Sequence, residues 1–213
     1  TATEMLSANW DPLVERAVDA LTDGNPALSP TVVARPADLQ LARNKTRLIK
    51  FHGCAVKAQG DPDNYREWLV ASNDQVTAFC TKPNNQGLVT ALTNVAGIQR
   101  TLMLGLSAQD SNIQEIFNKA ANQLTWQLAD PTPSYVFSEQ ELGMDQRSLL
   151  RNVYRGQITA ENVTAVYEAA RIQAYAKRLL TALLLDVWSR KLQALIPLAP
   201  GALQLTERKS LCA

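Results

Sequence analysis

The sequence predicts an α/β fold built on an open, mainly parallel sheet with helices on both faces, followed by a helical carboxyl-terminal segment. Short apolar runs alternate with stretches whose apolar residues recur at helical spacing, across residues 1–155. The run Thr101-Leu102-Met103-Leu104 has the form of a continuously apolar strand, which is typical of strands buried on both faces of a parallel sheet. From Thr159 to Ile196 the alternation stops, and one or two long amphipathic helices are expected.

The first expected strand and helix lie within the first 21 residues. Thr3 to Ser7 is a short strand-like run. Asp11 before Pro12 is a good helix start, because the carboxylate can cap the helix and proline supplies a preset φ at its first position. The expected helix carries an apolar stripe made of Leu13, Val14, Ala17, Val18 and Leu21.

The next expected elements lead to the only histidine of the chain. A weak second strand over 31–34 and a polar connection over 35–46 precede a strand from Arg47 to Phe51. Asp61-Pro62 again has the form of a helix start, and Asn73-Asp74 is expected to end that helix.

The rest of the predicted sheet follows the same alternation. A helix is expected from residue 84 or 85 to Ile98, before the strand over 101–104. Ser111-Asn112-Ile113-Gln114 has the spacing of a capping box at the start of a helix that carries Ile113, Ile116, Phe117, Ala120 and Leu124. Ser134 to Phe137 is the last strand expected, with a helix from Gly143 to Tyr154 behind it.

The carboxyl-terminal segment divides into a helical extension, residues 156–196, and a loose tail, residues 197–213. Pro197 and Pro200 stop the expected helices. One face of the extension is apolar and carries Leu180, Leu184, Val187, Leu192 and Leu195.

Composition limits the class of protein. The 213-residue chain has a formal net charge of +1, so no global field would gather nucleic acid or an anionic membrane. Its three cysteines are odd in number and far apart, which indicates free thiols in a reducing, cytoplasmic compartment. The most apolar run is interrupted by Asp186 and is too short to span a bilayer, and no signal peptide is visible.

His52-Gly53 is the stretch most suggestive of chemistry. A strand leads directly into the imidazole, whose unperturbed pKa of about 6.5 lets it accept a proton near neutrality, and Gly53 allows the turn that follows. A single histidine is nevertheless more often structural.

Polar residues follow two other expected strands, and all three strand ends would open onto one rim of the sheet. Asn9 and Asp11 follow the first strand, and Gly105, Ser107, Asp110 and Asn112 follow the strand over 101–104. Ligands of open α/β sheets bind outside the carboxyl ends of the strands, so we expect a binding site at this rim.

These residues resemble the sirtuins. Ser7-Ala8-Asn9-Trp10-Asp11 resembles their asparagine-x-aspartate motif, Lys50-Phe51-His52-Gly53 their histidine-glycine motif, and Gly105-Leu106-Ser107 their glycine-threonine-serine motif, in the same order. The extended pattern Gly-x-Ser-x-x-Asp-x-Asn at 105–112 is closer to the sirtuin-like NAD hydrolase domains of bacterial antiphage defence proteins than to deacetylases. The resemblance covers residues 1–155 and implies a Rossmann-like domain that uses NAD as its substrate.

Two departures from the sirtuin pattern shape the expectation. The four cysteines of the deacetylase zinc module have no counterpart here, which weighs against zinc and against deacylation. The phosphate-binding glycine loop and the central first strand of the family lie upstream of the asparagine-x-aspartate motif and have no counterpart either. We therefore expect an amino-terminally truncated domain with a sheet edge or an apolar face uncovered.

The resemblance implies a role for each residue. Asn9 would hold the water or a ribose hydroxyl, Asp11 would contact the nicotinamide carboxamide, and His52 would act as general base. Gly53, Gly105, Ser107, Asp110 and Asn112 would line the cofactor, the phosphates or the adenine ribose.

Structural readings of the same residues stay open. Asp11 is equally explained as a helix cap, Asn9 as a turn residue, and Asp110 as a favourable charge at a helix start. Cys54, beside the site, is expected to be a small buried apolar group.

The resemblance as a whole implies an NAD hydrolase that releases nicotinamide and ADP-ribose, inactive or incomplete in this fragment, and able to self-associate through its carboxyl-terminal helices. A non-catalytic domain that binds NAD or ADP-ribose is the alternative, and a deacylase is a third.

Overall fold

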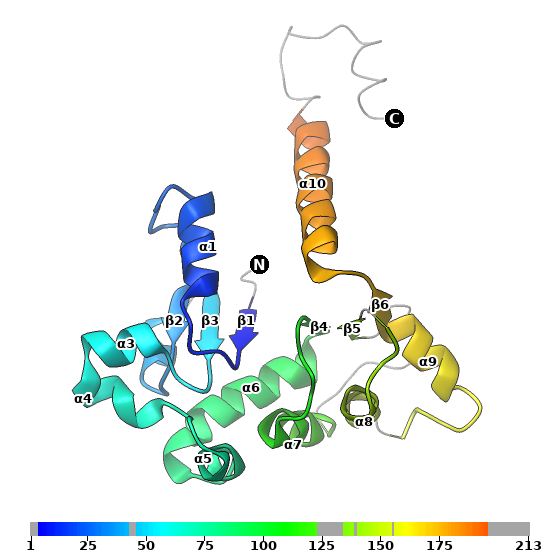
Figure 1. Cartoon of the computed structure of the whole chain (residues 1–213), viewed down its shortest axis with the longest axis horizontal. Helices are drawn as coiled ribbons and strands as arrows, with labels where there is room; N and C mark the ends of the chain where they lie inside the picture. Colours follow the sequence, from blue (N-terminus) through cyan, green and yellow to red (C-terminus); the bar gives the residue numbers. More distant parts are fainter. Residues whose placement is uncertain (1–3, 43–45, 123–133, 139, 155, 196–213) are drawn as a thin grey trace, which may run out of the picture.

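The computed structural model describes residues 4–42, 46–122, 134–138, 140–154 and 156–195, and within them the predicted α/β class is confirmed (Figure 1). The strands form two three-stranded parallel sheets, in the orders β1-β3-β2 and β4-β5-β6. Helices surround both sheets, and α6 (Gln86–Ile98) runs beneath β3 and β1 toward β4 in this view. The arrangement is that of an open Rossmann-like sheet whose pairing is interrupted between β1 and β4.

The first sheet contains the three strands expected from the sequence. β1 (Glu4–Ser7), β2 (Thr31–Val33) and β3 (Arg47–Lys50) lie within a residue or so of the predicted bounds. β3 is the middle strand, with Leu48 opposite both Met5 and Val32. Because β3 is paired on both edges and buried, it places the residues that follow it rigidly.

The helices beside this sheet agree in part with the prediction. α1 (Leu13–Leu21) is confirmed, and the Asp11 carboxylate accepts a hydrogen bond from the Leu13 N–H at 3.0 Å, as a capping residue does. Two short helices were not predicted: α2 (Asp38–Leu41) and α3 (Ala55–Gly60). Both are too short to show an apolar period.

The region around residues 61–85 corrects one prediction. Pro62 begins α4 (Pro62–Tyr65) as expected, and the short η1 (Arg66–Trp68) continues it. Asn73-Asp74 does not end a helix but begins α5 (Asn73–Ala78), because Ser72 and Gln75 form a capping box there. After η2 (Pro83–Asn85), the predicted helix α6 is confirmed.

The second sheet differs from the prediction at two points. It consists of β4 (Leu102–Met103), β5 (Tyr135–Ser138) and β6 (Arg171–Gln173), so Ser134 to Phe137 is not the last strand. β4 is not buried on both faces: Met103 is buried, but Leu102 and Leu104 are 46% and 42% exposed. The reason is that β4 is an edge strand, paired only with β5 among the described strands.

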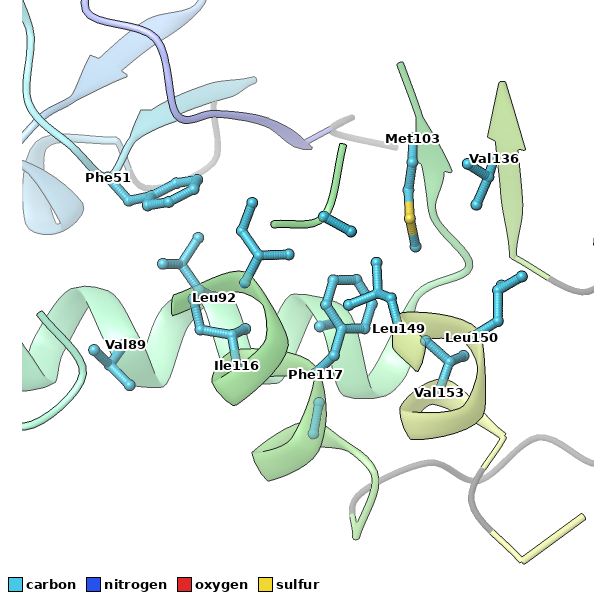
Figure 2. Close-up of a cluster of buried hydrophobic side chains, with 14 of the residues drawn as sticks. Phe51, Val89, Leu92, Met103, Ile116, Phe117, Val136, Leu149, Leu150 and Val153 are labelled. Atoms are coloured by element: carbon cyan, nitrogen blue, oxygen red, sulfur yellow. The ribbon is translucent and has the colours of Figure 1, made fainter. Parts of the chain in front are cut away.

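Two further helices lie below the second sheet and close the core. α7 (Ser111–Ala120) and α8 (Met144–Val153) pack side by side, and Figure 2 shows Ile116 and Phe117 of α7 between Leu92 of α6 and Leu149 of α8. The expected capping box at 111–114 is wrong, because Asp110 is the capping residue and accepts from the Asn112 N–H at 2.8 Å.

The carboxyl-terminal segment contains α9 (Val163–Ala170), β6 and the 20-residue helix α10 (Ala176–Leu195). Figure 1 shows α10 extending away from both sheets. The predicted tail, residues 197–213, and Leu124 lie outside the described residues. None of the helices in the described part of the chain combines the length and apolar character needed to cross a bilayer.

Candidate functional site

Three segments of the chain meet at the carboxyl ends of β1, β3 and β4, where the sequence predicts a site. The Phe51 N–H donates to the Ser7 carbonyl at 3.2 Å, and the Ala55 N–H donates to the Trp10 carbonyl at 3.1 Å, so the segments after β1 and β3 lie together. The loop between β4 and α7 joins them through Asn112, which contacts His52. The rim therefore forms around His52.

His52 is buried, with only 6% of its surface exposed. Its Nε2 lies 3.2 Å from the Asn112 amide nitrogen and 3.4 Å from the Asp110 carboxylate. Because an amide nitrogen only donates, Nε2 is the acceptor of the Asn112 contact, and the ring proton lies on Nδ1. The rings of Phe51 and Phe79 pack edge-on against the imidazole, 4.5 and 5.8 Å between centroids.

The surroundings of His52 keep its imidazole neutral. Burial lowers its pKa below the usual 6.5, and the nearby Asp110 carboxylate and a hydrogen bond with the Ala8 backbone offset only part of that shift. At neutral pH the ring is therefore an uncharged base. A proton arriving at Nε2 would meet the Asp110 carboxylate.

Asp110 and Asn112, which were expected to line the cofactor, both contact His52. One Asp110 oxygen caps α7 through the Asn112 N–H, and the other faces His52. Asn112 is 2% exposed and reaches the same imidazole nitrogen. The spacing Asp-x-Asn at a helix start was the available sequence signal for this arrangement, because the cap and the first turn lie on one side of the helix end.

Gly53 is required by the backbone. Its φ is +92°, and a Cβ there would lie 2.8 Å from the Trp68 carbonyl oxygen and 3.0 Å from the Leu69 Cα. The Val70 N–H donates to the His52 carbonyl at 3.0 Å, which closes this approach of the two segments. The predicted turn at Gly53 is confirmed, and the turn sets the direction of His52.

The loop between β4 and α7 holds Gly105 and Ser107 at the surface. Gly105 has φ +61° with open space where a Cβ would be, and Ala108, fully buried, has φ +60°. The Ser107 hydroxyl accepts from the Gln109 N–H at 3.5 Å. Two left-handed residues thus bend the loop so that it returns to α7 beside His52.

Asn9 and Asp11 both lie in the segment after β1. Asn9 is exposed, and its N–H donates to the Ser7 hydroxyl at 3.1 Å, as in a turn. One Asp11 oxygen accepts from the Leu13 N–H at the start of α1, although Pro12 and not Asp11 occupies the N-cap position. The structural and functional readings of Asp11 are compatible, because a carboxylate has a second oxygen.

Lys50 is a residue of this region that the sequence reasoning missed. It is 1% exposed and donates to the main-chain carbonyls of Trp10 and Asp11. A lysine inside a buried strand, two residues before the histidine, was the available signal, because lysine is almost never fully buried unless paired.

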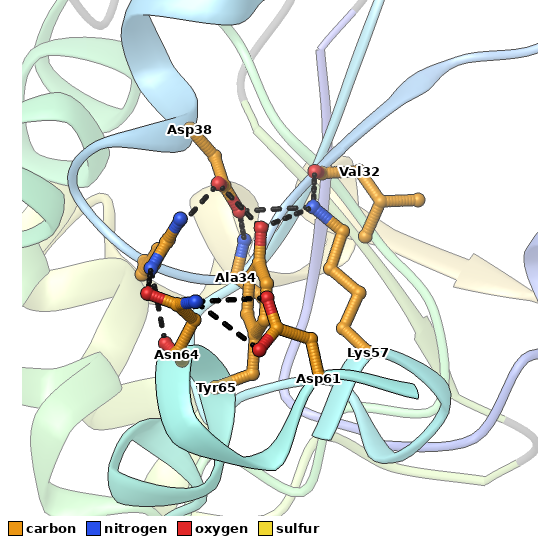
Figure 3. Close-up of polar contacts among 8 residues, drawn as sticks. Val32, Ala34, Asp38, Lys57, Asp61, Asn64 and Tyr65 are labelled. Carbon is orange, nitrogen blue, oxygen red and sulfur yellow. Dashed lines mark hydrogen bonds and ion pairs between the residues drawn. The ribbon is translucent and has the colours of Figure 1, made fainter. Parts of the chain in front are cut away.

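A second polar cluster fastens β2 to α3 and α4 (Figure 3). The buried Asp38 carboxylate accepts from the Ala34 N–H, from Lys57 and from the Tyr65 hydroxyl at 2.9–3.0 Å. Burial alone would raise the pKa of Asp38. The hydrogen bonds and the Lys57 charge together outweigh burial, so the pKa of Asp38 lies below its usual range. The carboxylate is satisfied within the chain, which identifies a structural cluster.

The remaining candidate groups lie apart from His52 or are inert. Within the described ranges, no group of three or more His, Cys, Asp or Glu side chains is placed to hold a metal ion. Cys54 is buried as expected, and burial raises the pKa of Cys80 to about 11. A pocket of about 410 Å³ lies by Glu4, Arg47 and Asn94, at the opposite ends of β1 and β3 from the rim.

Comparison with known proteins identifies a family. The family model described as "SIR2-like domain" matches residues 3–165, which is most of the chain and includes all three motifs. A search of curated proteins and a search of solved structures found no match.

Proposed function

The chain belongs to the SIR2-like family, and from this premise we propose that its site is that of an NAD hydrolase, which converts NAD and water into nicotinamide and ADP-ribose. The family supports NAD as the substrate. One observation carries the choice of hydrolysis: a buried, neutral His52 faces the Asp110 carboxylate at the end of the middle strand β3. A domain that only binds NAD needs no such base.

In the proposed reaction the bond between the ribose C1 and the nicotinamide nitrogen breaks, and nicotinamide leaves with the electron pair. Water then bonds to C1 and gives up one proton. His52 Nε2 takes that proton, directly or through a ribose hydroxyl, and later releases it to solvent. The substrate displaces the Asn112 amide from Nε2, and Asp110 stabilises the imidazolium while it exists.

The other rim residues are proposed to hold the substrate. Asn9, exposed beside the rim, orients the attacking water or a ribose hydroxyl. Asp11 receives the nicotinamide carboxamide on the oxygen that does not cap α1. Gly105 and Ser107 face the phosphates or the adenine ribose together with the amino-terminal donors of α7. The resemblance of the 105–112 pattern to defence-type NAD hydrolase domains supports a role in antiphage defence through NAD consumption, and the odd, widely spaced cysteines support a cytoplasmic location.

The direct test follows nicotinamide release from NAD by the complete gene product. We expect release that Asn9→Ala reduces, whereas Asn94→Ala, an exposed asparagine on α6, leaves it unchanged. Calorimetric titration with NAD is run on the same samples. Binding without nicotinamide release would instead favour the alternative, a non-catalytic domain that binds NAD or ADP-ribose.

Asp110 gives a prediction about pH. Asparagine can still cap α7, but Asp110→Asn removes the negative charge that raises the pKa of His52. The pKa of His52 then falls further, so the acid limb of the kcat/KM profile moves to lower pH. The plateau falls about tenfold, because a charge-assisted contact to the imidazolium is lost. Asp145→Asn, at the start of α8, is the control. An acid limb that moves to higher pH would contradict this role.

The helix α10 supports the proposal of self-association. Its apolar side chains are 42–64% exposed and are Leu180, Leu183, Leu184, Leu185, Val187, Trp188, Leu192 and Leu195. A single helix gains little stability without packing of its apolar face, so α10 calls for a partner. Leu185, Trp188, Leu192 and Leu195 follow the 3-4-3 spacing of a two-helix seam, and we propose α10 of a second copy as that partner.

Light scattering after size exclusion tests this association. We expect a mass twice that of one chain, and a single-chain mass for the double variant Leu185→Glu/Leu192→Glu, because a charge in the seam lacks a partner. Ser189→Glu, on the same helix outside the seam, should keep the doubled mass. A wild-type protein of single-chain mass at micromolar concentration would refute the association.

A further inference from the structure

Lys50 occupies an unusual position for a lysine. Its side chain is 1% exposed, and it lies on β3, two residues before His52. The ammonium has three donors, and three acceptors surround it: the Asp11 carbonyl, the Trp10 carbonyl at 3.3 Å, and a Glu15 carboxylate oxygen at 2.8 Å. Two of the three belong to the segment that carries Asn9.

Burial of the Lys50–Glu15 pair costs free energy of folding. A buried ammonium must lose its water, and a single carboxylate compensates its charge. The other Glu15 oxygen is buried and has no hydrogen-bond partner among the described residues. Apolar residues of similar size often fill such places at equal or better stability. A buried pair of this kind therefore calls for a reason other than stability.

We propose that Lys50 is a positioning residue, whose ammonium holds the Asn9–Asp11 segment against β3 so that Asn9 and His52 act on one substrate. This inference rests on the proposed NAD hydrolysis. The Ala55 N–H also holds the Trp10 carbonyl at 3.1 Å, but Asp11 is held to β3 through Lys50. Loss of the ammonium releases the Asp11 end of the segment, and a displacement of about 1 Å in an active site can lower the rate roughly 100-fold.

The kinetic test uses the complete gene product with Lys50→Met, which keeps the length of the side chain but removes its three donors. We expect kcat for NAD cleavage to fall about 100-fold. The Kd for NAD should rise less, by up to about tenfold, because Asp11 supplies only one of the proposed substrate contacts, whereas Asn9 acts on the water or ribose in the transition state. Glu15→Gln keeps both carbonyl contacts of Lys50 and should retain kcat within about fivefold.

A double-mutant cycle separates positioning from general damage. Once the segment is free, Asn9→Ala should cost little more in the Lys50→Met background, so the two losses should not multiply. The double variant Lys50→Met/Glu15→Leu leaves no unpaired buried charge, and it keeps the test valid if Lys50→Met alone does not fold. Multiplying losses, or a kcat within threefold of wild type in either Lys50 variant, would overturn the proposal.

Amide hydrogen exchange measures how firmly Lys50 holds this segment, and the measurement does not depend on enzymatic activity. Exchange over residues 9–13 should accelerate at least about tenfold in the Lys50 variants and clearly less in Glu15→Gln, which keeps both carbonyl contacts of Lys50 but removes the charge that pairs with it. Unchanged exchange in the Lys50 variants overturns the positioning role whatever the enzyme does. A wild-type protein that leaves NAD intact would instead overturn the proposed function, so the two failures are distinguishable.

Discussion

Replacement of His52 by alanine is expected to lower kcat for NAD cleavage by about 10²- to 10⁴-fold, the usual contribution of a general base. The Nε2 atom of His52 carries a lone pair that can accept a proton at the rim, and the surroundings of the imidazole keep it neutral near pH 7. Without it, the attacking water must lose its proton to solvent. The Kd for NAD should change far less than kcat, because the base acts in the transition state.

Nicotinamide release under saturating NAD measures this effect, together with thermal unfolding to verify the fold. Thr93→Val is the matched control, since Thr93 is a buried polar residue of α6 whose hydroxyl has no hydrogen-bond partner in the part of the chain that the structure describes. That substitution should leave both kcat and stability nearly unchanged. Cleavage by His52→Ala at the wild-type rate would remove His52 from the mechanism.

Replacement of Gly53 by alanine should destabilise the fold by about 2–5 kcal/mol. The left-handed backbone at φ +92° costs an L-residue about 1–2 kcal/mol. The new Cβ would also overlap the Trp68 carbonyl oxygen and Leu69, which adds about 1–3 kcal/mol of overpacking. The backbone of Trp68 cannot move away freely, because the Val70 N–H is bonded to the His52 carbonyl.

Urea unfolding of Gly53→Ala, compared with Gly24→Ala, separates the backbone cost from the overpacking cost. Gly24 has φ +67°, and no described atom lies within 4 Å of an added Cβ, so only the backbone cost of about 1–2 kcal/mol applies. Equal losses in the two variants would show that the approach of Trp68 and Leu69 is not a real constraint. A larger loss at Gly53 would establish that its role is to build the turn after His52.

The parts of the fold that the sequence predicted are those with clear local signals. Strands β1 and β3 are apolar runs bounded by polar residues, and α6 has an apolar face repeated over 13 residues. Strand β6 was not predicted, because Arg171-Ile172-Gln173 contains only one apolar residue and directly follows a helix. Its strand conformation comes from pairing with β5, which is a tertiary contact.

The site was predictable to the same extent. Parallel strand ends meet at one edge, which was enough to bring Asn9, His52 and the 105–112 loop together. The Asp-x-Asn spacing indicated that Asp110 and Asn112 share one helix end, but their contact with His52 also depends on the left-handed turn at Ala108, which the sequence did not indicate. The role of Lys50 depends on the three-dimensional path of the Trp10 and Asp11 carbonyls.

The sheets have edges at β1 and β4 that are paired on one side only among the described strands. β1 and β4 face each other between the sheets in Figure 1, and each pairs with one described strand. Leu6 on β1 and Leu102 on β4 are 40% and 46% exposed, as expected for unpaired edges.

One time course tests the central claim most directly: NAD, nicotinamide and ADP-ribose quantified together in a reaction of the complete gene product without any acylated peptide. The proposed mechanism predicts that NAD declines while nicotinamide and ADP-ribose appear in equal amounts. NAD that stays intact while bound, or that is consumed only when an acyl-lysine peptide is added, would contradict hydrolysis at His52.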